Sequence, residues 1–121
     1  MMNRENQIKN IGFVLTKAPI ESPLTYRFLS LAQSAIDKDK TIGLFLISDG
    51  VWLAKKNQKN KPYELLKKLL KNGAEVTVSK DHLMAAGIED SDLINGVNVT
   101  EQPYVDLVDH VMEKWNKVIT I

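Results

Sequence analysis

The chain of 121 residues contains no cysteine at all. This absence excludes disulfide bonds, thiolate metal sites and every form of catalysis that needs a thiol. Long apolar runs are also missing, and the longest, residues 42–47, is far too short to cross a bilayer. The first six residues are mostly polar and lack the apolar core of a signal peptide, so we expect a cytoplasmic protein.

An excess of charge of either sign is lacking as well. Sixteen basic side chains face fifteen acidic ones, which leaves a formal net charge of +1. This balance gives no reason to expect nucleic acid or a membrane surface as a partner. The two histidines, His82 and His110, are not paired with carboxylates at metal-ligand spacing, and glycine-rich phosphate loops are absent. We therefore expect no metal and no cofactor.

The apolar residues that are present alternate between strand-like and helix-like spacing. Strands are predicted over residues 11–16, 41–48, 74–79, 97–99 and 117–121. Residues 41–48 are apolar almost throughout, which is typical of a parallel strand covered on both faces. The sequence predicts a polar extension over residues 1–10. A single α/β domain over residues 11–121 follows, in three α/β/α layers around a five-stranded parallel sheet.

Helices are predicted between these strands. Ser22 and Pro23 have the character of an N-cap followed by a first-turn proline, and Pro62 and Pro103 begin two further helices. The first helix is predicted to bury one apolar stripe, which consists of Leu24, Phe28, Leu31 and Ala35. The second is predicted to turn Leu65, Leu66, Leu69 and Leu70 inward. The last is predicted to carry Tyr104, Leu107, Val108, Val111 and Trp115 on one face, with His110 near its polar side.

Ser79 is the most informative residue, because it closes the third predicted strand and precedes a short helical segment. Open α/β sheets place their chemistry at such carboxyl ends of strands. Ser79 acts either as a nucleophile with His82 as its base or as the N-cap of the helix, and the second reading is favoured because no nucleophile elbow is present. Asp49, after the second strand, is either a ligand-binding carboxylate or a turn residue that caps the helix at Val51.

The segment of residues 55–61 carries four lysines between two predicted helices. It either contacts phosphate groups or forms a solvated loop. The second interpretation is favoured, because no aromatic residue is interleaved with the lysines and the chain as a whole is almost neutral.

The order of several weak motifs resembles the DsrE/DsrF-like family, which includes the TusD-type sulfur relay proteins. The resemblance extends from about residue 11 to residue 121. The motifs that carry it are Asp49-Gly50-Val51, Asn72-Gly73-Ala74, Leu83-Met84-Ala85-Ala86-Gly87-Ile88, Asp92-Leu93-Ile94-Asn95-Gly96-Val97 and Trp115-Asn116-Lys117-Val118.

The resemblance implies a fold and an assembly, but two departures from the family pattern count against catalysis. Members of that family have a five-stranded parallel sheet and usually form trimers or hexamers. Active members carry a cysteine at the end of the third strand that receives and passes on sulfane sulfur, and Ser79 occupies that position here. Met84 stands where the family often has an arginine. A serine hydroxyl cannot hold a sulfane chain, so sulfurtransferase activity is implied by resemblance only.

Two functional hypotheses follow. The preferred one is a non-catalytic binding or scaffold member of the family, a homo-trimer or homo-hexamer, with a cysteine-bearing sulfur-relay paralogue as a further partner. The alternative is an enzyme or small-ligand-binding protein that reuses the same site through Asp49, Ser79 and His82. Four apolar residues just after strand ends are predicted to lie in subunit contacts, namely Trp52, Leu53, Met84 and Ile88.

Overall fold

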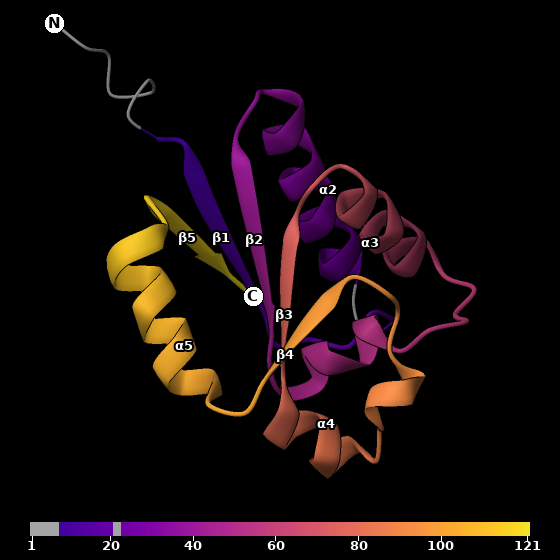
Figure 1. Ribbon diagram of the computed structural model, residues 1–121. Helices are drawn as coiled ribbons and strands as arrows, with labels where there is room; N and C mark the ends of the chain where they lie inside the picture. Colours follow the sequence, from indigo (N-terminus) through magenta and orange to yellow (C-terminus); the bar gives the residue numbers. More distant parts are fainter. Residues whose placement is uncertain (1–7, 21–22) are drawn as a thin grey trace, which may run out of the picture.

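A computed structural model describes residues 8–20 and 23–121, which form a single five-stranded parallel sheet with helices on both faces (Figure 1). The strand order is β4-β3-β2-β1-β5. The strands are β1 (Asn10–Leu15), β2 (Thr41–Leu46), β3 (Glu75–Ser79), β4 (Val97–Thr100) and β5 (Lys117–Thr120). The predicted fold class and all five strands are confirmed. Residues 1–7 of the predicted extension and the predicted cap Ser22 lie outside the described residues.

The first face of the sheet is apolar and holds the main core. Phe13, Leu44 and Val76 lie side by side in the register of β1, β2 and β3, and all three are buried. Helices α2 (Pro23–Asp37) and α3 (Lys61–Lys71) cover this face, as Figure 1 shows. The ring of Phe28 on α2 meets that of Phe13 edge-on, with centroids 5.3 Å apart. Burial of this face supplies the main stabilisation of the fold.

The buried stripe of α2 differs from the predicted one. Its core-facing residues are Thr25, Phe28, Leu29 and Ala32, whereas Leu24 and Leu31 are exposed. The observed set follows the spacing i, i+3, i+4, i+7 from Thr25, which keeps four side chains within one face of a helix. Leu24 and Leu31 lie at the edge of that face, so the prediction that they belong to the buried stripe is wrong.

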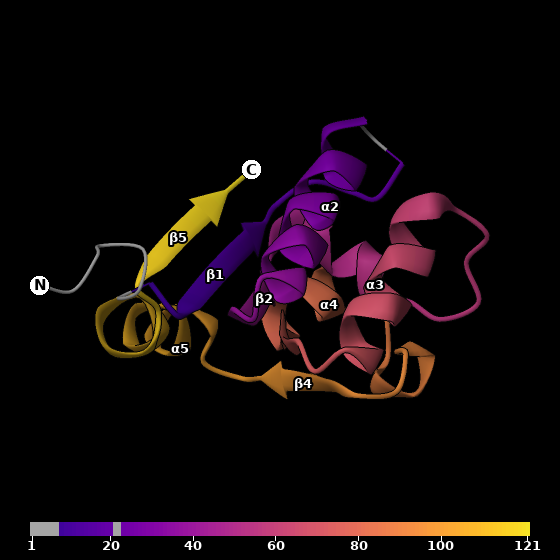
Figure 2. The same ribbon diagram turned by 90° about the horizontal axis from the view of Figure 1, so that it is seen from above.

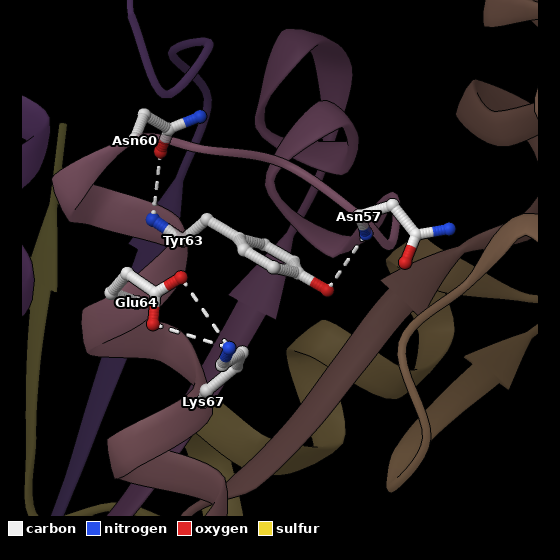
Figure 3. Close-up of polar contacts among 5 residues, drawn as sticks. All are labelled: Asn57, Asn60, Tyr63, Glu64 and Lys67. Atoms are coloured by element: carbon white, nitrogen blue, oxygen red, sulfur yellow. Dashed lines mark hydrogen bonds and ion pairs between the residues drawn. The ribbon is translucent and has the colours of Figure 1, made fainter.

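The lysine-rich segment is followed by helix α3, whose first turn is capped by a polar side chain. Asn60 Oδ1 accepts a hydrogen bond from the Tyr63 backbone N at 2.8 Å, and the Tyr63 hydroxyl accepts one from the Asn57 backbone N at 3.1 Å (Figure 3). Leu66 and Leu69 are buried, and Leu65 and Leu70 pack partly buried against the core, as predicted.

The second face of the sheet carries α5 (Pro103–Asp109), which Figure 2 shows on the side opposite to α2 and α3. A π-helical turn, η3 (His110–Lys114), extends α5, and Trp115 then adopts an extended backbone. The Trp115 indole lies against Gly12 of β1 and Gly43 of β2, where a Cβ atom on either glycine would overlap it. The prediction that Trp115 continues the helical face is therefore wrong, because the side chain turns onto the sheet.

The remaining elements are short helices near the carboxyl ends of the strands. They are the 3-10 helix η1 (Ser48–Ala54), α4 (Lys80–Ala86) and the 3-10 helix η2 (Asp90–Asp92). Leu53 and Ile88 are buried in the core of the chain itself, so their predicted place in a subunit contact is wrong. Met84 and Trp52 remain exposed, at 67% and 37%. Within residues 8–20 and 23–121, no helix has the length and apolarity needed to cross a membrane.

We predict that Gly12→Ala lowers the free energy of unfolding by about 1–3 kcal/mol, because the new methyl group must displace the Trp115 indole. Urea unfolding followed by circular dichroism measures the change. Ser34→Ala, on the exposed side of α2, is the control and shifts stability by no more than about 0.5 kcal/mol. A Gly12→Ala protein as stable as the unmodified chain contradicts the packing of Trp115 on β1.

Candidate functional site

Ser79 ends β3 and begins the connection to α4. Its side chain is fully buried, at 0% exposure, and its hydroxyl accepts a hydrogen bond from the His82 backbone N at 3.4 Å. The extended backbone of Ser79 and this contact are those of an N-cap residue. The structure therefore uses the serine oxygen to satisfy the first turn of α4.

His82 contacts Ser79 through its backbone N–H. Its ring lies edge-on to that of Tyr104 on α5, with centroids 6.2 Å apart. The Nδ1 atom is buried and has no hydrogen-bond partner in the part of the chain that the structure describes. No hydrogen bond joins the His82 ring to the Ser79 hydroxyl among those residues, so the arrangement of base and nucleophile is not formed.

Asp49 lies in η1 and is exposed to solvent. The helix begins at Ser48, and its N-cap residue, Ile47, makes no side-chain cap hydrogen bond. The expectation that Asp49 caps a helix starting at Val51 is therefore wrong, because the helix begins three residues earlier. Of the three candidate residues, the structure joins Ser79 to His82 by a backbone contact and leaves Asp49 at the surface.

A polar cleft of about 620 Å³ opens on the second face of the sheet, beside α5. Thr77 of β3 and Asn98 and Thr100 of β4 line its floor, and Asp106 of α5 and His110 of η3 line one wall. The Thr100 hydroxyl donates a hydrogen bond to the Asp106 carboxylate. This arrangement offers hydroxyl, amide, imidazole and carboxylate groups to a small polar molecule.

Some of the groups that line the cleft are engaged in local contacts. At the rim, Lys80 Nζ forms an ion pair with Asp90 at 2.7 Å. On the wall, His110 Nδ1 lies 2.6 Å from the Asp106 carbonyl oxygen. The His110 ring also packs on Phe45 and Trp115, with centroids 5.9 and 5.0 Å away. His110 therefore lies on the polar side of the helix, beside Asp106 and Lys114, as predicted, and this side faces the sheet.

The cleft was missed from the sequence, although a signal for it is present. Thr77 stands between Val76 and Val78, and Asn98 stands between Val97 and Val99. Such alternation of apolar and polar side chains is typical of strands with one face toward solvent. We expected both faces of the parallel sheet to be covered by helices. That expectation did not predict a cleft, because α5 covers only part of the second face.

The sequence as a whole matches the DsrE/DsrF-like family over residues 9–119. The chain belongs to the DsrE/DsrF-like family. It is 32% identical, over 97% of its length and 98% of the relative's, to an uncharacterised protein of Methanopyrus kandleri. It is also 32% identical, over 87% of its length and 94% of the relative's, to an uncharacterised protein of Methanocaldococcus jannaschii. The predicted resemblance is thereby confirmed.

Solved structures of similar proteins share this architecture. The crystal structure of the ychN protein from E. coli superposes with a TM-score of 0.85 at 26% identity, covering 94% of this chain and all of that one. A protein of unknown function from Methanobacterium thermoautotrophicum superposes with a TM-score of 0.79 at 19% identity, covering 93% and 99% of the two chains, and shares the fold. This DsrE/DsrF-like chain lacks any cysteine.

We predict that a cysteine placed at Ser79 is protected from solvent. In Ser79→Cys the thiol occupies a fully buried position, so Ellman's reagent reacts at least about tenfold more slowly with the native protein than with the urea-unfolded one. Ser91→Cys, at an exposed position in η2, is the matched control and reacts equally fast in both states. Equal rates for the two native variants contradict the burial of Ser79.

Proposed function

We propose that this DsrE/DsrF-like protein is a non-catalytic binding or scaffold member of a sulfur-relay system, located in the cytoplasm. The observation that carries the proposal is the state of Ser79. The residue stands at the end of β3, where active members of the family carry their cysteine, and its buried hydroxyl caps α4. A side chain in this role stabilises the fold instead of presenting a reactive atom.

The chemistry of oxygen and sulfur supports the proposal. A persulfide forms when a thiolate attacks a sulfane sulfur. A serine hydroxyl is too weakly acidic to act in the place of the thiolate, and its oxygen cannot hold a chain of sulfur atoms. Activation of Ser79 as an oxygen nucleophile needs a base within hydrogen-bond reach. The His82 ring instead lies against Tyr104.

A second candidate function is the binding of a small polar molecule, which the cleft on the second face favours. The cleft reaches the carboxyl ends of β3 and β4 through Lys80 and Thr100, and Thr100 pairs with Ser79 in the sheet register. Ligands of open α/β sheets bind at such strand ends. The lining of this cleft does not include Asp49, Ser79 or His82. The ligand groups we assign are therefore Thr77, Asn98 and Asp106.

We further propose that the protein assembles as a homo-trimer or homo-hexamer, with a cysteine-bearing paralogue as a further partner. Met84 is exposed on α4, and Trp52 is partly exposed on η1. Large apolar side chains that remain exposed on short helices are candidates for subunit contacts. The contact between α4 and η1 brings their segments together at the carboxyl edge of the sheet.

We predict that the purified protein gains no mass when it is incubated with a persulfide donor, because no residue can form the covalent intermediate. Intact-protein mass spectrometry measures the result. Ser91→Cys, with an exposed thiol, is the positive control for the donor and gains the mass of one sulfur atom. The same gain in the unmodified chain refutes the non-catalytic proposal.

We predict a mass of three or six chains by light scattering at micromolar protein concentration. Met84→Lys reduces the assembled fraction, because an unpaired charge is costly at an apolar interface. Ser34→Lys, at an exposed position on α2, is the control and leaves the mass unchanged. A monomer mass for the unmodified protein contradicts the proposed assembly.

A further inference from the structure

The net charge of this chain is close to zero because two strongly charged segments of the sequence have opposite signs. Residues 55–71 contain seven lysines and one glutamate, a net charge of +6. Residues 72–121 contain nine acidic and three basic side chains, a net charge of −6. Segregation on this scale creates long-range fields that orient a charged partner.

The basic region borders a groove between α2 and α3. The groove has a volume of about 570 Å³, and Tyr26 of α2 and Leu65 of α3 supply its apolar walls. Lys59, Lys61 and Lys68 line it as well. The one acidic residue in the lining, Glu64, is paired with Lys67 at 3.2 Å, as Figure 3 shows. The groove therefore combines apolar surface with positive charge.

The acidic region includes α5, whose outer side is apolar and exposed. Tyr104 is 61% exposed and Met112 is 76% exposed, although both are large side chains on a helix. An acidic row of two exposed residues flanks this stripe, because Asp109 and Glu113 are four residues apart on the helix. The complete apolar stripe consists of Tyr104, Val105 and Val108 of α5 and of Val111 and Met112 of η3, which continues α5.

The two surfaces lie on opposite faces of the sheet. In Figure 2, α5 is on one side of the strands and α2 and α3 are on the other, so one copy cannot bring its own two surfaces together. A twofold dimer through α5 would place one acidic row beside another and be opposed by repulsion. The charges instead favour a head-to-tail contact, in which each copy uses both of its surfaces.

We propose that α5 of one copy lies in the α2–α3 groove of a second copy of this chain. The apolar stripe of α5 contacts Tyr26 and Leu65, and its acidic row faces Lys59, Lys61 and Lys68. This is the helix-in-groove mode of recognition, with opposite charges fixing the orientation. The inference rests on the proposed homo-oligomer and adds the two surfaces that build it.

Charge reversal tests the contact in the full chain. Sedimentation velocity over a range of protein concentrations gives the association constant. Lys59→Glu combined with Lys68→Glu weakens association at least about tenfold, and so does Asp109→Lys combined with Glu113→Lys. A chain that carries all four substitutions restores association to within about threefold of the unmodified protein, because the charges again oppose each other. Raising sodium chloride from about 50 to 500 mM also weakens association of the unmodified chain.

Lys17→Glu combined with Lys38→Glu is the matched control. It changes the net charge by the same amount at exposed positions outside the groove lining, and leaves association unchanged. Thermal unfolding monitored by circular dichroism verifies that each variant is folded.

The outcomes separate this inference from the proposed function. An assembly that forms but ignores both charge reversals overturns the contact and leaves the proposed oligomer intact. A monomer at every concentration overturns both, while the sulfur-loading result decides the non-catalytic role independently. A monomer that binds short single-stranded DNA, and loses that binding in the Lys59→Glu and Lys68→Glu protein, overturns the contact and assigns the groove to a polyanion.

Discussion

The packing of Trp115 on two adjacent strands governs the second face of this protein. Gly12 and Gly43 have no Cβ, so the indole approaches β1 and β2 directly. This contact ends the π-helical turn after α5 and places the following residues as β5 beside β1. It also holds α5 over one part of the sheet, which leaves β3 and β4 to form the open polar cleft.

The position of Ser79 shows how a fold can keep the architecture of a reactive site without its chemistry. Strand β3 ends directly before the short helix α4. The first turn of a helix has backbone N–H groups without partners, so the last residue of β3 is in the position of a helix cap. A serine meets that need with its hydroxyl and contributes stability on the order of 1 kcal/mol. The family fold is thereby retained, while the sulfur atom on which a persulfide depends is absent.

Several details of the site were not accessible from the sequence. The Val-Thr-Val and Val-Asn-Val patterns in β3 and β4 indicate that one face of the sheet is open to solvent. They do not indicate which helix borders that face. Trp115 shares an apparent helical pattern with Val111, yet the π-helical turn ends before it and its indole packs on the sheet. Leu53 in η1 and Ile88 just after α4 also differ from expectation, because both side chains are buried in the core instead of facing outward.

The sequence by itself determined the order and kind of the elements, the parallel sheet and the absence of thiol chemistry. Local apolar spacing, proline and glycine positions and composition contain that information. Only the tertiary structure decided that Ser79 is buried and that Thr77, Asn98, Thr100 and Asp106 share a cleft. Only the tertiary structure, too, decided that the basic groove and the acidic helix lie on opposite faces of the sheet. Such proximities join residues far apart in the chain, and they depend on strand order and helix placement, which local patterns do not encode.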